Sequence, residues 1–235
     1  MGQSMTLKEM MEAIAPGGDE NHAPARERHL RVVPEKPRNP NHPKKGDCIR
    51  VDPIRDVQDI ERIKAMLSGR LRDLLLFTLG INTNLRASDI VALTVGQVRG
   101  LKPMEELELR ERKTGKMRRI SINETVIGAV EAYLATLPGD VTDTAPLFAS
   151  QRCGGRPLTV PSVNRMVKGW CRTIKLKGNY GSHSLRKTWG YHQRVTFGVD
   201  IPSLMVCFNH STQRQTLDYL CVQPEEVKKV YSHQL

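Results

Sequence analysis

The stretch Gly181-Ser-His-Ser-Leu-Arg-Lys-Thr-Trp-Gly190 sets an imidazole and a guanidinium three residues apart, at His183 and Arg186. The stretch has the composition of the start of a helix, and residues three apart on a helix share a face. That face can present a proton-transfer group and a permanent cation to one anion, and the planar fork of Arg suits phosphate oxygens. Taken alone, such a pair more often marks an ordinary histidine beside a solvated arginine. Its meaning therefore depends on partners elsewhere in the chain.

The bulk composition favours a folded domain that binds a polyanion. The 235 residues are 39% hydrophobic, an ordinary share for a soluble globular protein. Thirty-six Lys and Arg residues against 25 Asp and Glu residues give a formal net charge of +11. This imbalance favours nucleic acid over an acidic small molecule as a partner.

The cysteines and the apolar runs point to a cytoplasmic location. The five cysteines are odd in number and widely spaced, without the paired CxxC spacing of a structural zinc site, so we expect free thiols in a reducing compartment. No apolar run has the length of a signal peptide or approaches the roughly 18 residues that cross a bilayer, so we expect no membrane association. These cysteines are Cys48, Cys153, Cys171, Cys207 and Cys221.

The sequence divides near residue 50. Residues 5–14 predict one short amphipathic helix, and residues 17–47 combine five prolines with seven basic residues and almost no core-forming side chains. This segment is either a basic arm that follows a phosphate backbone or a linker. We therefore expect a short helix and a flexible basic Pro-rich arm over 1–49, and a folded domain over 50–235.

The folded part is predicted to be mainly α with a small antiparallel β-hairpin. Apolar residues at helical spacing and capping signals predict helices over 56–67, 71–80, 88–93, 123–137, 160–174, 184–197, 202–208 and 212–222, and a last helix entered through Pro224. Strand-like segments over 107–111 and 117–122 flank Lys113-Thr-Gly-Lys116, which predicts a hairpin turn with Gly at a positive φ.

Four further residues stand near turns or helix starts. Arg86 follows the apolar helix in a break rich in Asn, and Lys113 lies at the hairpin tip. His210 lies between two predicted helices, and Tyr219 follows nine residues later. Each alone has an ordinary explanation, as a surface Arg, a turn Lys, a capping His or a half-buried Tyr.

Taken in order, these residues resemble the active site of the tyrosine recombinase (phage integrase) family. The likeness covers about residues 50–232, the whole catalytic domain of that family. Its first block resembles Arg86 and Asp89 followed by Leu93-Thr-Val-Gly-Gln-Val98, and its H-x-x-R block resembles His183 to Arg186. Its last block resembles Phe208-Asn-His-Ser-Thr-Gln-Arg-Gln-Thr-Leu-Asp-Tyr219.

The chain also departs from the family pattern. Asn84 and Asn209 stand where Gly is usual, and Asn tolerates the left-handed conformation best among other residues. Asp89 replaces a Glu, which shortens a supporting carboxylate by one methylene. Lys187 replaces a frequent second His, so no proton-transfer role carries over to it. Residues 1–49 show no counterpart of the family's DNA-clamping domain, as in its short fimbrial-switch forms.

The resemblance implies DNA cleavage through a 3′-phosphotyrosine, with Tyr219 as nucleophile. Arg86 and Arg186 would stabilise the phosphate charge, His183 would accept or donate a proton, and Lys113 would protonate the leaving 5′ oxygen, with Lys116 as an alternative. His210 would orient by hydrogen bonding. No cofactor, metal ion or ATP is implied, because the carboxylates form no ligand cluster and the cations replace magnesium.

The implied partners are double-stranded DNA, further copies of the chain in a tetramer on DNA, and an accessory DNA-bending protein. Residues 224–235 either dock on a neighbouring copy or pack as a final helix in cis. Nine further basic residues would hold phosphates or form a solvated face: Arg110, Arg112, Arg118, Arg119, Arg152, Arg156, Arg165, Lys168 and Arg172. Two other functions stay open, a DNA-binding regulatory remnant and a relaxing enzyme like type IB topoisomerases.

Overall fold

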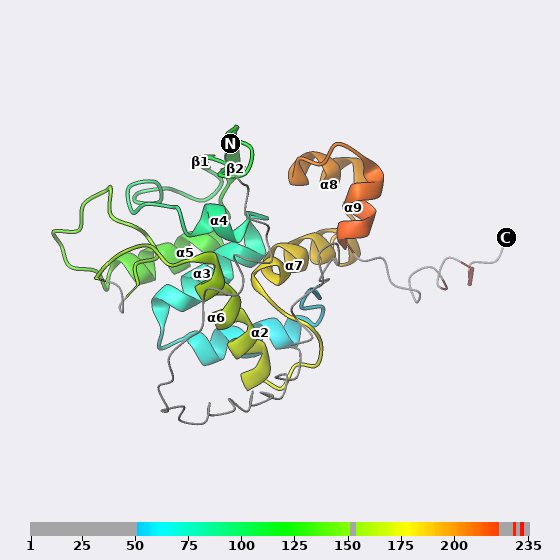
Figure 1. Cartoon of the computed structure of the whole chain (residues 1–235), viewed down its shortest axis with the longest axis horizontal. Coiled ribbons are helices and arrows are strands. Elements are labelled where there is room, and N and C mark those ends of the chain that lie inside the picture. The colour runs from blue at the N-terminus through cyan, green and yellow to red at the C-terminus, as the bar shows by residue number, and fades with distance from the viewer. Residues whose placement is uncertain (1–50, 151–153, 221–227, 229–230, 233–235) are drawn as a thin grey trace, which may run out of the picture. The chain divides into compact units, whose positions relative to one another are not determined.

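The apolar run at Leu74–Phe77 forms the middle of helix α3 (Leu71–Asn82), around which the other helices pack in this computed structural model (Figure 1). Three of its side chains, Leu75, Leu76 and Phe77, are fully buried. The structure describes residues 51–150, 154–220, 228 and 231–232, which belong to the compact unit Cys48–Leu235. The predicted helix over 5–14, the arm over 17–47, Cys48, Arg152, Cys153, Cys221 and most of the segment from Pro224 lie outside these residues.

The elements follow the predicted order. They are α2 (Val57–Leu67), α3, α4 (Ala87–Ile90), β1 (Glu106–Arg110), β2 (Met117–Ser121), α5 (Glu124–Leu134), α6 (Val160–Thr173), α7 (Ser182–Val195), α8 (Ile201–Phe208) and α9 (Gln213–Leu220). The strands β1 and β2 form a two-stranded antiparallel sheet. The prediction of a mainly α fold with one small hairpin is therefore confirmed. None of the helices within the described ranges is long and apolar enough to cross a bilayer.

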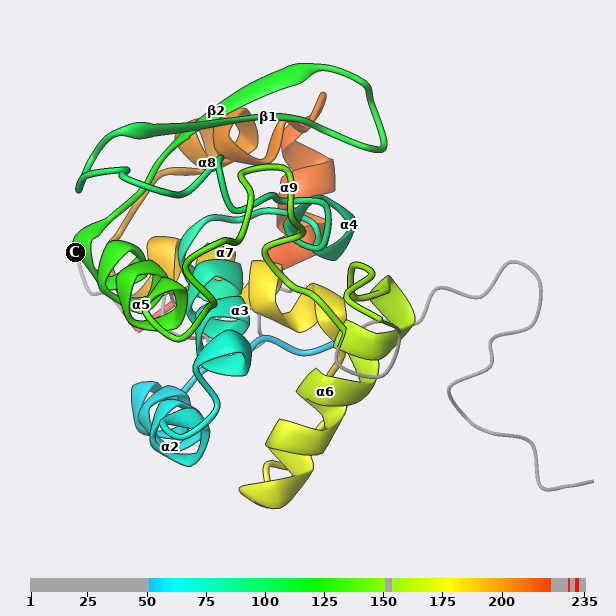
Figure 2. The same ribbon diagram turned by 90° about the vertical axis from the view of Figure 1, so that its left-hand side faces the viewer.

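One main hydrophobic core surrounds α3. Figure 2 shows α3 between α5 on one side and α6 on the other, with α2 next to its beginning. The Phe77 ring meets the Trp170 ring of α6 edge to face at a centroid distance of 5.9 Å. At Gly80 a Cβ atom would lie 2.6 Å from Leu185 Cδ1, so glycine allows α3 and α7 to approach closely. This packing fixes α7, which carries His183 and Arg186.

A second, smaller cluster lies at the other end of α7. Leu204, Phe208 and Leu220 are buried there, with Trp189 and Tyr219 packed against them. Figure 1 shows α8 and α9 together beside the C-terminal half of α7. A Cβ atom on the α7 glycine, Gly190, would lie 2.6 Å from the Phe208 ring and 2.7 Å from Leu220, so its absence lets both helices sit against α7.

Several predicted helix boundaries differ from the structure by one to three residues, and two of these differences have a clear tertiary cause. Helix α7 begins at Ser182, because extended Gly181 precedes it and Asn164 Oδ1 accepts a hydrogen bond of 3.0 Å from the Ser182 amide. Helix α4 ends at Ile90 instead of reaching Leu93. The chain beyond it pairs with a distant segment, since Leu147 N donates to Leu93 O and Val95 N donates to Ala145 O, both at 2.9 Å. Tertiary pairing thus overrides the helical pattern.

Candidate active site

Arg86 is held at the start of α4 by a carboxylate from the hairpin. Its backbone is extended and immediately precedes the helix, and its Nη1 lies 2.9 Å from Glu111 Oε2. The Glu111 side chain is only 1% exposed, and it also accepts hydrogen bonds of 2.8 Å from Thr114 Oγ1 and Arg118 Nη1. Burial alone would raise the pKa of Glu111, but these hydrogen bonds and the charge of Arg86 lower it below its ordinary value. Glu111 is therefore an anion that fixes two arginines.

Asp89 supports the hairpin loop rather than Arg86. Its Oδ1 accepts a hydrogen bond of 2.9 Å from the backbone N–H of Arg112, and the side chain is buried. The carboxylate that pairs with Arg86 is therefore Glu111, which lies 25 residues away in the sequence. A family pattern that places the acidic residue three positions after the Arg did not identify it.

The hairpin loop carries Lys113 toward α4 and α7. Glu111 N donates to Lys116 O at 2.9 Å across the loop, and Gly115 has the positive φ predicted for it, +70°. Lys113 is exposed and lines a cleft of about 290 Å³ together with Arg86 and His183. Lys116 instead lines a separate groove beside Arg118, toward α8. Of the two lysines, Lys113 is the one that shares a cleft with Arg86.

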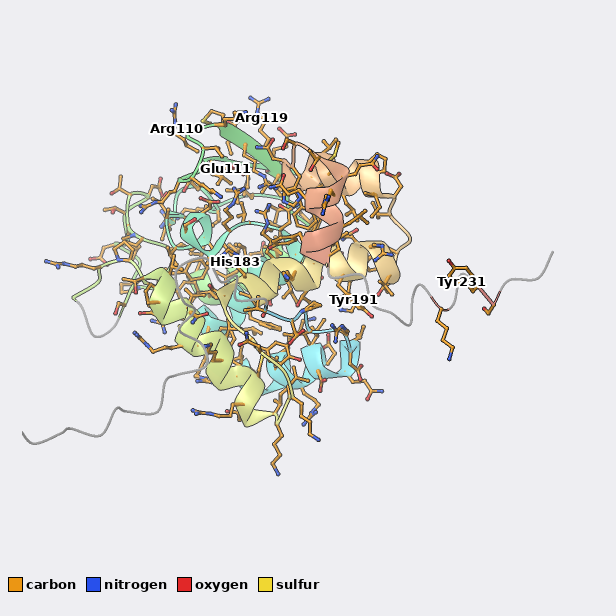
Figure 3. All side chains as sticks on the ribbon, turned by 45° about the vertical axis from the view of Figure 1, so that its right-hand side comes forward. Arg110, Glu111, Arg119, His183, Tyr191 and Tyr231 are labelled. Atoms are coloured by element: carbon orange, nitrogen blue, oxygen red, sulfur yellow. The ribbon has the colours of Figure 1, made fainter. Side chains whose placement is uncertain are left out.

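His183 faces this cleft from the first turn of α7. Figure 3 shows it at the start of α7, with Glu111 toward the body of the hairpin and Arg110 and Arg119 at the hairpin's outer edge. The residue is exposed, and it lines the cleft. Burial, followed by the positive charges of Arg186, Lys187, Arg86 and Lys113, lowers the pKa of His183. The ring is therefore neutral near pH 7 and able to accept a proton.

Arg186, one turn further along α7, is a buried cation. The residue is 3% exposed, and its Nη2 donates a hydrogen bond of 3.0 Å to the carbonyl of Phe208 at the end of α8. Its Nη1 has no hydrogen-bond partner among the described residues. Burial lowers the pKa of Arg186 to about 10, which leaves the guanidinium charged at neutral pH. A buried guanidinium with a donor to spare is suited to bind an anion.

The Tyr219 ring lies beside Arg186 and His210. The centroid of the phenol ring is 5.9 Å from the guanidinium carbon of Arg186 and 5.5 Å from the centroid of the imidazole. His210 stacks on Phe208 and shares a hydrogen bond of 3.0 Å between its Nδ1 and Thr216 Oγ1. Burial and the charges of Arg186 and Arg86 lower the pKa of His210 to about 4, so this ring is neutral at pH 7.

Two left-handed asparagines turn the chain at both ends of this site. Asn84 has φ of 48° before Arg86, and Asn209 has φ of 55° before His210, as expected for residues that replace glycine. Arg118 of β2 links the two turns, since it donates to Asn84 Oδ1 and, at 2.7 Å, to the carbonyl of Cys207. The hairpin is thereby tied to the end of α8, which it crosses in Figure 2.

The structure thus brings the six predicted residues to one region, from α4, the hairpin loop, α7, the α8–α9 turn and α9. Sequence reasoning missed Glu111 and the buried position of Lys187. Arg118 was grouped with the phosphate-binding or solvated residues, which is wrong, because its side chain is 13% exposed and bonded to Glu111. The alternation of buried and exposed residues in β1, extended by one position, would have pointed Glu111 inward. Among the described residues no cluster of His, Cys, Asp or Glu could hold a metal ion.

Comparison with known proteins finds the same family that the sequence resembles. The model of the phage integrase family matches residues 55–226. The chain is 33% identical over 184 residues to a probable integrase/recombinase, YoeC, of Bacillus subtilis, an alignment that covers 77% of this chain and 95% of the relative. It is 29% identical over 160 residues to the tyrosine recombinase XerC of Caldanaerobacter subterraneus, where the match covers 67% of this chain and 43% of the relative.

A solved structure shares the fold. The crystal structure of the XerH site-specific recombinase bound to its palindromic difH substrate, a post-cleavage complex, superposes with a TM-score of 0.62 at 15% identity. The match covers 80% of this chain and 53% of the XerH chain. The chain therefore spans about half the length of XerH and less than half the length of the XerC relative.

Proposed function

The chain belongs to the phage integrase family, and from this premise we propose that it is a site-specific DNA recombinase that cleaves and rejoins duplex DNA through a 3′-phosphotyrosine. One observation carries the proposal: the charged, buried guanidinium of Arg186 has a donor to spare and lies against the Tyr219 ring, one helix turn from His183. These groups fit an anion whose central atom the phenol can attack. The phosphodiester of DNA is such an anion.

In the proposed reaction, the Tyr219 oxygen attacks phosphorus and the bond from phosphorus to the 5′ oxygen breaks. Arg86 and Arg186 bind the nonbridging oxygens and stabilise the charge of the pentacoordinate transition state. His183 is neutral near pH 7 and takes the phenolic proton, while Lys113 gives a proton to the leaving 5′ oxygen. The products are a 3′-phosphotyrosine and a free 5′-hydroxyl, and rejoining reverses the same steps.

His210 acts in this scheme by hydrogen bonding and not by proton transfer. Its pKa near 4 leaves one ring nitrogen protonated and one free at neutral pH. Because Nδ1 pairs with Thr216, the opposite side of the ring is the part that can reach a phosphate. Thr216 is fully buried at 0% exposure and therefore holds the ring in one orientation.

Duplex DNA is the proposed substrate, and exposed basic residues of the hairpin and of the α6 region are its proposed contacts. Arg112 and Arg119 on the hairpin, and Arg156, Arg165 and Arg172 before and on α6, are exposed. Phosphate contacts of this kind position a protein without reading sequence. We propose that four copies act on two sites in the nucleoid of the cytoplasm, as the family arrangement implies.

The proposal is tested with a nicked suicide duplex, on which cleavage traps the protein covalently. The DNA is first selected from the sequences that flank the gene. We expect an adduct with the wild-type chain and none with Tyr219→Phe, a change that keeps the ring packing against Phe208.

The alternatives give different results in the same assay. No adduct from the wild-type chain, with DNA still bound, would indicate a regulatory DNA-binding protein. Relaxation of a supercoiled plasmid that lacks the site, with no strand exchange between sites, would indicate a relaxing enzyme. An adduct that persists in Tyr219→Phe would show that another side chain is the nucleophile.

A further inference from the structure

Lys187 is a buried lysine on α7, directly after Arg186. It is 7% exposed, a degree of burial that is rare for a lysine. Its Nζ lies 5.4 Å from the centroid of the Tyr219 ring, within the range of a cation–π contact. The ammonium therefore faces the ring of the proposed nucleophile.

Two cations lie against the Tyr219 ring. From α7 the ring meets Arg186 and Lys187, and from the α8–α9 turn it meets His210 and the neutral Phe208 ring. Because the pKa of His210 is lowered to about 4, its ring carries no charge at neutral pH. Arg186 and Lys187 therefore both bring positive charge to this ring. The charge of Lys187 also reaches the cleft, where it helps to lower the pKa of His183.

The two cations differ in what a bound phosphate does to them. Arg186 has a planar fork, which suits the nonbridging oxygens of the phosphodiester, and pairing with that anion offsets its charge. Lys187 is a compact ammonium on a flexible stem and lies over the ring. Its charge acts on the phenol directly. A cation within about 4–6 Å favours the ionised form of an acid.

We propose that Lys187 is a positioning residue for the nucleophile, whose ammonium holds the Tyr219 ring and favours its phenolate both when the phenol attacks and when it leaves. This inference rests on the proposed function, since it assumes that Tyr219 is the nucleophile. It assigns to Lys187 no transfer of a proton. Lys113 in the cleft keeps that role toward the leaving 5′ oxygen.

The matched variants are Lys187→Met, which keeps a long unbranched side chain without the charge, and Lys187→Arg, which keeps the charge. Single-turnover cleavage of the suicide duplex is measured from pH 6 to pH 9.5. With Lys187→Met we expect cleavage about tenfold slower at pH 7 and a rising limb moved up by about one pH unit, because one nearby charge shifts an ionisation by at least that much. Lys187→Arg should restore most of the rate.

A second substrate separates Lys187 from Lys113. In a duplex with sulfur as the bridging 5′ atom, the leaving thiolate, from a thiol with a pKa of about 8.5, needs no proton. This duplex should rescue Lys113→Ala and leave Lys187→Met slow. Rejoining should also be slower in Lys187→Met, because the phenolate is then the leaving group.

Several outcomes overturn the inference. Cleavage by Lys187→Met at the wild-type rate at every pH would overturn it. A cleavage rate reduced by the same factor at every pH would also overturn it, because that result indicates a packing role alone. Rescue of Lys187→Met by the sulfur substrate would make Lys187 the acid instead. If Lys187→Met does not fold, Lys187→Arg supplies the test. A well-folded Lys187→Arg protein whose cleavage has a different pH profile from wild type would overturn the inference. An absent wild-type adduct, or one that survives Tyr219→Phe, is the failure of the proposed function.

Discussion

The main core around α3 and the small cluster of α8 and α9 hold the two halves of the candidate site in different ways. The elements that carry Arg86, His183 and Arg186 pack on α3, where Leu75, Leu76 and Phe77 are fully buried. His210 and Tyr219 belong to a cluster with three buried apolar residues, Leu204, Phe208 and Leu220. The phosphate-binding half is therefore anchored by far more buried apolar surface than the half that carries the nucleophile.

Three links from the larger region reach the carbonyl groups at the end of α8. Arg186 donates to Phe208 O at 3.0 Å, while Arg118 and Asn84 donate to Cys207 O at 2.7 and 2.9 Å. Segments with few buried contacts open locally at a lower free energy than the whole domain. We therefore expect α8 and α9 to be the less stable unit. These polar links then set where the nucleophile stands relative to the phosphate.

The largest expected effect comes from removing one aromatic ring from either region. Phe77→Ala should lower the free energy of unfolding by about 3–5 kcal/mol, because it leaves a cavity in the main core. Phe208→Ala removes the ring that contacts Trp189, His210 and Tyr219, and should loosen α8 and α9 while the main core remains folded.

The chain's two tryptophans make this comparison measurable. Trp170 contacts Phe77 in the main core, and Trp189 contacts Phe208 in the small cluster. In Trp170→Phe and Trp189→Phe backgrounds, fluorescence during denaturant unfolding follows one region at a time. With Phe208→Ala the Trp189 signal should change at lower denaturant than the Trp170 signal. Coincident transitions would mean that the two clusters unfold as one unit.

The next effect tests the residue that joins the two regions. Arg186→Ala should slow cleavage by about 100- to 1000-fold, the usual cost of losing one donor to a transition state. The same change removes the hydrogen bond to Phe208 O, so the Trp189 signal should also move to lower denaturant. Arg186→Lys serves as the control, because it keeps the charge without the fork. Cleavage within threefold of wild type in Arg186→Ala would exclude it from the site.

The smallest expected effects are pH dependences that differ between the regions. His210 has its pKa lowered from 6.5 to about 4, so the unfolded chain binds the proton more readily. The contribution of His210 to the free energy of unfolding is therefore complete above pH 6.5 and declines as the pH falls toward 4. Glu111 has its pKa lowered below 4.5, so its contribution is complete above that pH and declines as the pH falls through the folded value.

The unfolding temperature followed through Trp189 should therefore fall as the pH is lowered from 6.5 to 4. This fall should be smaller in His210→Gln. The link from Glu111 to Arg86 and Arg118 should weaken only below pH 4.5, and Glu111→Gln should remove that acid-side loss. An unchanged profile in His210→Gln would show that its ring does not cause the higher-pH decline.

The candidate residues were found through their resemblance to sequence blocks of the phage integrase family, and each block is short and local. The spacing of His183 and Arg186 and the turn residues Asn84 and Asn209 are properties of a few consecutive residues. Helix periods and caps are equally local, and the structure keeps them, as in the hydrogen bond of 3.0 Å from Val126 N to the capping Asn123. The failed boundary at α4 arose where a distant segment pairs with Leu93 and Val95.

By itself, the sequence determined the order of the helices and the hairpin, because backbone periodicity and turn chemistry act over a few residues. The six candidate residues followed from the resemblance of short sequence blocks to the phage integrase family. The tertiary structure decided which charges are buried and paired. Glu111, not Asp89, holds Arg86, and Arg118 faces inward to the end of α8. Lys187 turns toward Tyr219 because α7 packs there against α8 and α9. Burial depends on which distant segments pack together, and that sets the charge around the phenol.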